Sequence, residues 1–202
     1  MRAVALIVAL LLWGALLPGA GAAQGGGVAV SGSRAAYTFP EALEFQVRVA
    51  RAGAVREVIL FFGRVESPLV RRVYPAFSPD AEMTVRYTED LEPGQYAPGT
   101  MFRYWWEFHL DDGTVHATEP QTFEYTDPRF DWVVLAGERV DLYHYADARR
   151  AAALLAAAEE AIARLEEDTG VPVERRVRVY SYASARDMAL ALASRSEAYD
   201  DR

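Results

Sequence analysis

Apolar and polar positions alternate along the first half of the chain, a pattern typical of half-buried β-strands. The alternation begins after Phe39 and is clearest at 102–110, where every second residue is large and apolar. The residues on this apolar face are Phe102, Tyr104, Trp106, Phe108 and Leu110. The pattern predicts a strand with one side in a hydrophobic core and the other side facing solvent.

Further apolar or alternating runs occupy the rest of this half of the chain. They lie at 43–49, 55–62, 70–77, 83–88, 115–117 and 123–125. Turn signals rich in Pro, Gly and Asp separate several of them, at 78–80, 93–94 and 98–99. Closely spaced short strands with regular turns are typical of a sandwich. We therefore predict an immunoglobulin-like or fibronectin type III-like β-sandwich over 39–127.

The strand at 102–110 continues into a predicted hairpin. Asp112-Gly113 favours a two-residue type I′ turn. Such a turn places His109 opposite His116 on the polar face, with Glu107 two residues away. Histidine and carboxylate side chains are zinc ligands, so a metal-binding sandwich is one hypothesis. Solvated surface histidines are the simpler interpretation, because no neighbour offers a fourth ligand, and we assign no metal site here.

Residues 128–202 change to a helical periodicity. The predicted order is strand, helix, strand and helix, at 140–145, 148–168, 177–182 and 184 onward. Asp147 is a favourable N-cap, Gly170 a favourable C-terminal stop, and Ser184 opens a capping box for the second helix. So small an α/β unit cannot close a core on both faces of a sheet. We expect the truncated opening of a larger domain; the alternative is a complete small unit packed on the sandwich.

The N-terminus carries an export signal. Arg2 precedes an apolar run over 3–17, and small residues at 20–23 suit a signal peptidase. We predict a cleaved signal peptide at 1–23, with an uncleaved membrane-associated anchor as the alternative. The Gly- and Ser-rich residues after it predict a flexible leader at 24–38. In either case the protein is expected to be extracytoplasmic, secreted or associated with the cell envelope.

Composition excludes several classes of function. The net charge is −8 and no stretch concentrates positive charge, so we expect no nucleic-acid partner. The chain has no cysteine, which excludes a disulfide scaffold, a thiolate zinc site and a cysteine nucleophile. The sequence contains no H-E-x-x-H, no G-x-S-x-G and no phosphate-binding glycine loop. We accordingly assign no catalytic, cofactor-binding or metal residue.

Two further side chains carry hypotheses. His144 lies on a predicted strand between tyrosines and is interpreted as structural. Trp105 points away from the aromatic core face. An exposed tryptophan on a sandwich can stack on a sugar or fill a joint between domains, and we favour the joint.

The order of motifs in the mature chain resembles a known family. The sandwich ends in Asp127-Pro128-Arg129-Phe130-Asp131-Trp132. After it come the strand 140–145, the alanine-rich helix ending at 165–171, the strand 177–182 and the helix opened by 184–188. This arrangement resembles secreted bacterial proteins with a peptidase MA-like domain of the gluzincin type. The individual motifs are moderately specific, and their order carries more weight.

The resemblance implies a zinc metallopeptidase, a hydrolase whose H-E-x-x-H helix follows this opening segment. In that family the two histidines and a downstream glutamate bind zinc, and the glutamate between the histidines activates water. This chain ends before that helix, so no family catalytic residue is carried over and zinc is expected only in the missing segment. Our leading hypothesis is therefore an N-terminal portion that is inactive as it stands. Arg129, Phe130 and Trp132 would fasten the sandwich to the catalytic domain.

The main partner expected on this hypothesis is the downstream catalytic segment of the same protein. An envelope protein or a glycan is the other expected partner. The alternative function is a non-enzymatic extracytoplasmic binding module that recognises a glycan or protein through Trp105 and its polar-face neighbours.

Overall fold

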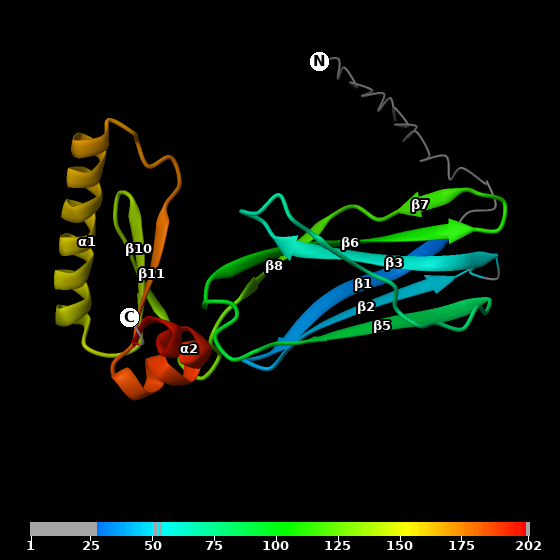
Figure 1. Ribbon diagram of the computed structural model, residues 1–202, viewed down its shortest axis with the longest axis horizontal. Coiled ribbons are helices and arrows are strands. Elements are labelled where there is room, and N and C mark those ends of the chain that lie inside the picture. The colour runs from blue at the N-terminus through cyan, green and yellow to red at the C-terminus, as the bar shows by residue number, and fades with distance from the viewer. Residues whose placement is uncertain (1–27, 51, 53, 201–202) are drawn as a thin grey trace, which may run out of the picture.

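The computed structural model describes residues 28–50, 52 and 54–200, which form two parts joined end to end (Figure 1). The larger part is built of strands, and the smaller part combines strands with two helices. The predicted signal peptide at 1–23 lies outside the described residues. No helix among the described residues is long and apolar enough to cross a membrane.

Two antiparallel sheets make up the larger part. The first contains β1 (Ala29–Thr38), β2 (Ala42–Ala50) and β5 (Glu82–Asp90), in the order β1-β2-β5. The strands of the second are β3 (Val55–Arg64), β4 (Arg71–Val73), β6 (Thr100–Leu110), β7 (Val115–Ala117) and β8 (Gln121–Tyr125). Their order is β4-β3-β6-β7, with β8 also paired to β6.

The two sheets pack face to face around one hydrophobic core. Phe45 of β2 reaches across to Phe62 of β3 and Tyr104 of β6, with ring centroids 4.9 and 5.4 Å apart. Trp106 and Phe108 of β6 are fully buried, as the alternation predicts. A mostly β protein with antiparallel sheets is therefore confirmed, while the immunoglobulin-like or fibronectin-like topology stays a prediction.

The structure corrects the predicted boundaries of the strands. The leader predicted at 24–38 is wrong over 29–38, because these residues form β1 and pair with β2. The prediction failed because β1 lies at a sheet edge, where backbone pairing to β2 holds it and few of its side chains are buried. The strand predicted at 70–77 is reduced to β4, at 71–73.

The predicted hairpin has the wrong register. His109 pairs with Val115, and His116 pairs with Phe108, so the two histidines are not opposite each other. The connection holds three residues, 111–113, because Leu110 donates its backbone N–H to Thr114 and Gly113 takes a φ of 84°. A glycine of positive φ after a tight turn forms a bulge, which shifts the return strand by one residue.

The smaller part is a three-stranded mixed sheet with one long helix against it. Its strands are β9 (Val133–Ala136), β10 (Val140–His144) and β11 (Val177–Ser181), in the order β11-β10-β9. Strand β10 runs parallel to β11 and antiparallel to β9. The sequence interpretation missed β9, a four-residue strand. Helix α1 (Ala148–Thr169) packs on β10 and β9, and helix α2 (Ala185–Asp200) follows β11.

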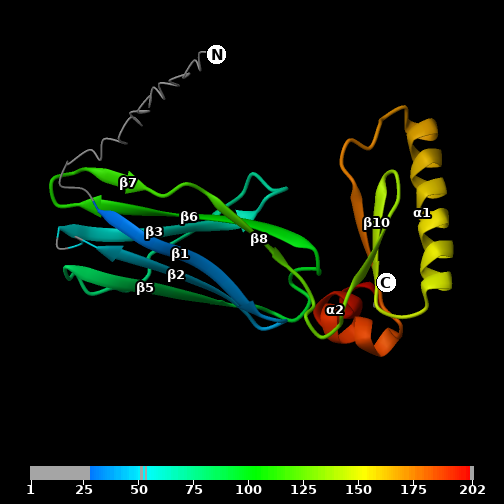
Figure 2. The ribbon, with the colours of Figure 1, turned by 180° about the vertical axis from the view of Figure 1, so that it is seen from behind.

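The ends of α1 agree with the sequence prediction. The Asp147 side chain accepts hydrogen bonds from the backbone N–H groups of Arg149 and Arg150. Gly170 adopts a left-handed conformation and donates its N–H to Glu166. Seen from either side, α1 lies on the face of the sheet that is remote from the sandwich (Figures 1 and 2). The opposite face of the sheet is therefore turned toward the sandwich.

Candidate functional site: the joint between the two parts

The carboxylate of Asp127 is the centre of the joint. It follows β8 directly and its side chain is completely buried. Three nitrogens of Arg129 donate to it: the backbone N–H at 3.1 Å, Nε at 2.8 Å and Nη2 at 2.5 Å. The hydroxyl of Tyr182, just beyond β11, donates to the same carboxylate at 2.9 Å. A buried carboxylate needs this number of donors to offset its lost hydration.

An aromatic cluster surrounds this carboxylate. The ring of Phe130 stacks on Tyr145 with centroids 3.9 Å apart and planes 7° apart. The indole of Trp132 meets Tyr145, Tyr180 and Tyr182 edge to face at 5.0 to 5.2 Å. Its Nε1 donates to the backbone carbonyl of Asp127 at 2.7 Å. The cluster thus packs ring surface around the carboxylate while satisfying its one indole donor.

A second polar contact joins β8 to β11. The carboxylate of Glu124 accepts hydrogen bonds from Arg178 and from the Tyr180 hydroxyl, both at 3.2 Å. Arg178 also donates to the backbone carbonyl of Gly99 at 3.1 Å. Glu124 therefore holds β11, and Asp127 holds Tyr182, the residue that follows this strand.

The start of α2 belongs to the same network. The Nη2 of Arg129 donates to the backbone carbonyl of Asp187 at 3.2 Å. The Asp187 carboxylate accepts from Ser184 at 2.8 Å and from the Tyr145 hydroxyl at 2.9 Å. The hydrogen bond from Ser184, followed by that from Tyr145, lowers the pKa of Asp187. Ser184 also accepts from the Asp187 backbone N–H, so the predicted capping contact is present.

The tyrosines of the joint act as hydrogen-bond donors. Burial, and then the hydrogen bond to Asp127, raises the pKa of Tyr182. Burial, and then the negative charge of Glu124, raises the pKa of Tyr180. Both phenols therefore stay protonated at ordinary pH, which is the state the two carboxylates require.

These contacts place Arg129, Phe130 and Trp132 at the connection between the two parts, and their role in fastening the sandwich to a catalytic domain stays a prediction. The sequence analysis did not single out Asp127, Tyr145 or Tyr182 as joint residues. No sequence signal identifies their role, because the hydrogen bond between Asp127 and Tyr182 spans 55 positions. The contacts at the joint are hydrogen bonds, one ion pair and ring stacking, which connect the two parts.

The prediction that Trp105 fills the joint is wrong. Trp105 stacks on Phe61, its cross-strand partner, with centroids 4.9 Å apart and planes 4° apart. Trp105 lies in the middle of β6, whereas the joint lies at the start of that strand, where Thr100 pairs with Tyr125. Five residues of strand, roughly 17 Å, separate Trp105 from that end.

The histidines lie apart from the joint contacts. His109 faces Glu107 at 3.4 Å and Glu57 at 3.9 Å on the outer side of the second sheet. No group of three metal-ligating side chains occurs in the described part of the chain. His144 is 6% exposed and its Nδ1 lies 3.2 Å from the carbonyl of Ala146, while its Nε2 is buried without a partner. It lines a hollow of about 170 Å³ at the carboxyl ends of β10 and β11.

Comparisons with known proteins identify no family for this chain. No protein-family model and no curated protein matches the chain. Among solved structures, the chain is similar to the crystal structure of a Br derivative of BhCBM56, at 12% identity and a TM-score of 0.32, over 46% of this chain and 89% of that one. It is also similar to purple acid phosphatase PPD1 from yellow lupin (Lupinus luteus) seeds, at 12% identity and a TM-score of 0.36, over 55% and 21%. Neither similarity carries an argument about function.

Proposed function

We propose that this chain is the N-terminal portion of an exported zinc metallopeptidase-like protein, in which the sandwich supports the opening of a peptidase MA-like domain. One observation carries the proposal: the smaller part leaves much of its apolar surface uncovered. Its exposed apolar side chains are Val133, Val134, Leu154, Leu165, Val171, Met188 and Leu190. Monomeric proteins rarely expose large contiguous apolar patches, and patches of this kind mark interaction sites.

The sheet itself supports the same proposal. Strand β11 is the outermost strand of the described sheet, so one side of its backbone has no strand partner there. The unpaired N–H and C=O groups of such an edge strand are a template for pairing with a further strand. Further strands and helices of the same domain would pair with β11 and cover α1. The downstream catalytic segment is therefore the main proposed partner of this chain.

Zinc enters the proposal only through that downstream segment. The described residues contain no group of three His, Asp or Glu side chains that could hold the ion. We therefore place no step of peptide hydrolysis on any residue of this chain. Its own role is to present the opening strands and helix of the catalytic domain in a fixed position on the sandwich.

The test is to read the coding sequence beyond codon 202 and to assay both products. An in-frame H-E-x-x-H within roughly the next hundred residues is expected from the usual position of that helix in such enzymes. The extended protein should show proteolysis that a chelator abolishes, and this chain alone should show none. A stop codon with no such continuation, or chelator-sensitive proteolysis by this chain alone, would overturn the proposal.

A second function, a non-enzymatic binding module, has one observation in its favour. The outer face of the second sheet carries a row of side chains in register, Arg72, Phe61 and Trp105. The Arg72 guanidinium lies 5.8 Å from the Phe61 ring centroid and 5.0 Å from that of Tyr74, which is 56% exposed. Aromatic faces of this kind stack on sugars.

Hydrogen exchange separates the two proposals. A finished binding module protects the amides of β11 as firmly as those of β3, whereas the opening of a larger domain exchanges them much faster. Quenching of tryptophan fluorescence by neutral oligosaccharides, lost on Trp105→Ala, would support the binding module.

A further inference from the structure

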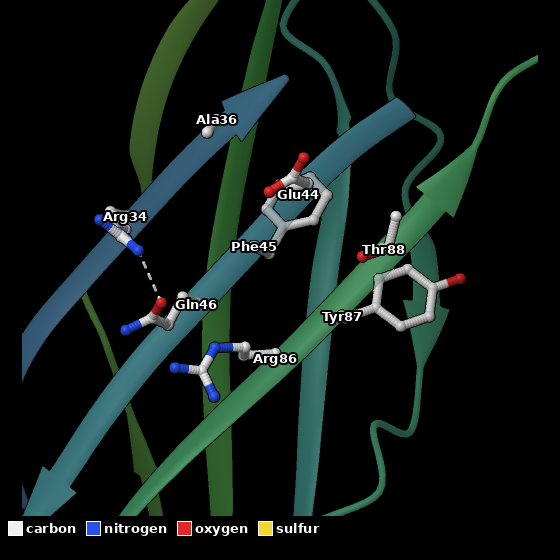
Figure 3. Close-up of a pocket in the computed structure, with 8 residues that line it drawn as sticks. All are labelled: Arg34, Ala36, Glu44, Phe45, Gln46, Arg86, Tyr87 and Thr88. Carbon is white, nitrogen blue, oxygen red and sulfur yellow. Dashed lines mark hydrogen bonds between the residues drawn. The ribbon is translucent and has the colours of Figure 1, made fainter. Parts of the chain in front are cut away.

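Three polar side chains form a row across the outer face of the first sheet. Arg34 of β1 pairs in register with Gln46 of β2, and Gln46 pairs with Arg86 of β5. Their neighbours Phe45, Val47 and Val85 point into the core, so the three residues of the row point outward. The two guanidinium groups lie on opposite sides of the Gln46 side chain (Figure 3).

Gln46 forms the floor of this row. It is only 8% exposed, although it lies on the outer face. Its Oε1 accepts a hydrogen bond from Nη2 of Arg34 at 2.8 Å. This contact fixes the amide, so its Nε2 is available as a donor beside the two guanidinium groups. Gln46 brings no negative charge, and the row carries two positive charges over a neutral floor.

The neighbouring rows do not neutralise these charges by contact. On one side Arg48 adds a third guanidinium, between Gly32 and Thr84. On the other side Glu44 accepts from Thr38 at 3.3 Å. Among the described residues, no carboxylate lies within ion-pair distance of Arg34, Arg48 or Arg86. Three guanidinium groups without a carboxylate partner, gathered on one face of a protein that is acidic overall, favour an anionic ligand.

The surface is hollowed at this row. A hollow of about 130 Å³ is lined by Arg34, Glu44, Gln46 and Arg86. A second hollow of about 270 Å³ lies on the Arg48 side and shares Arg34 and Gln46 with the first. The guanidinium fork matches the oxygens of carboxylate and phosphate, and two such forks can hold one anionic group between them.

We propose that Arg34, Gln46 and Arg86 form a binding site for an oxyanion, a carboxylate or phosphate group, and that Arg48 extends the site along β2. The group belongs either to a small free anion or to an acidic saccharide. Glu44 limits the site at its other end, because its charge repels an anion there. The site is independent of the proposed peptidase function, since it lies on the sandwich and uses no residue of the joint.

Calorimetric titration of the purified protein at low ionic strength tests the site. The probes are inorganic phosphate and a trimer of galacturonic acid, with a neutral glucose trimer as the comparison. Binding of phosphate and of the uronate with similar affinity identifies a site for a free anion. Binding of the uronate alone identifies an acidic saccharide. Failure of both probes to bind, or equal binding of the neutral trimer, overturns the proposal.

Variants assign the binding to these residues. Arg34→Gln and Arg86→Gln should each weaken binding about tenfold or more, the size expected for one charge-assisted contact. Arg64→Gln is the matched control, an exposed arginine on β3 of the other sheet. Without anion, the variants should unfold at the same urea concentration as the parent protein. Added anion should raise the urea midpoint of the parent protein but not that of the double variant Arg34→Gln/Arg86→Gln. Binding that survives in the double variant contradicts the assignment.

Discussion

The carboxylate of Asp127 and the hydroxyl of Tyr182 are hydrogen-bonded at 2.9 Å across 55 positions of the sequence. Asp127 follows β8, the last strand of the sandwich, and Tyr182 follows β11, the last strand of the smaller part. The bond closes the joint, because the same carboxylate also holds Arg129. Stability of the smaller part should therefore depend on the end of the larger one.

Replacement of Asp127 tests this dependence. Asp127→Ala removes the acceptor of Tyr182 and of Arg129, and we expect a loss of about 2–3 kcal/mol in the free energy of unfolding. The loss stays in this range because Arg129 is about one-third exposed and can regain water. Urea unfolding measures it, and hydrogen exchange should show faster exchange in β10 and β11 than in β3. The exposed Asp131→Ala should change stability by less than about 0.5 kcal/mol; equal effects of the two changes would contradict this account.

Two glycines of similar conformation separate backbone strain from contact across the joint. Gly99 has a φ of 85°, and a Cβ added there would lie 2.6 Å from the ring of Tyr180. Gly113 has a φ of 84° and no atom within 4 Å of the same position. Gly113→Ala should therefore cost only the strain, about 1–2 kcal/mol. Gly99→Ala should cost about 1–3 kcal/mol more, because Tyr180 is held by Glu124 and Trp132. Thermal or urea unfolding measures both, and equal losses would show that the contact is unimportant.

The stacked pair on the outer face of the second sheet should contribute a measurable coupling. Phe61 and Trp105 are direct cross-strand partners with nearly parallel rings. A double-mutant cycle with Phe61→Ala and Trp105→Ala should give a coupling energy of about 0.5–1.5 kcal/mol. Additive losses would mean that each ring packs mainly on other neighbours. A cycle between Phe61 and the remote Tyr182 serves as the control and should show no coupling.

Alkaline pH should unfold the sandwich over a defined range. Burial raises the pKa of Tyr87 and of Tyr125 to about 12, from an ordinary value of 10.0. A group whose pKa is higher in the folded state stabilises the fold fully below its unfolded pKa, and this contribution is lost as pH rises. The urea midpoint should therefore fall between pH 10 and about 12. Tyr87→Phe should reduce that fall, and a midpoint that stays level to pH 12 would contradict the expectation.

Local sequence signals predicted the elements whose burial pattern or capping residues are visible in the sequence itself. The alternation over Phe102–Leu110 and the capping residues Asp147 and Gly170 gave a strand and a helix close to those observed. Strand β1 was not predicted, because its pairing to β2, more than its side chains, holds it at the sheet edge. The hairpin register was missed by one residue because a bulged glycine at 113 cannot be distinguished from a type I′ glycine by residue type alone.

The candidate sites depend on register and on distant pairing, which local patterns do not contain. Arg34, Gln46 and Arg86 come together only when three strands are aligned residue by residue. In the same way, Asp127 gave no signal of its own, since an aspartate before a proline is an ordinary turn residue. The joint role expected for Arg129, Phe130 and Trp132 came from the resemblance carried by the order of motifs, and not from a local pattern of these residues.

The two anchoring points on β11 have a mechanical consequence. Two parts joined by a single contact can rotate about it, whereas two separate contacts resist rotation as well as separation. Glu124 holds Arg178 and Tyr180 within β11, and Asp127 holds Tyr182 just beyond its end. A twist of the sandwich relative to the sheet of the smaller part would break one of these contacts. Torque applied at the far end of the sandwich is therefore transmitted to the sheet of the smaller part.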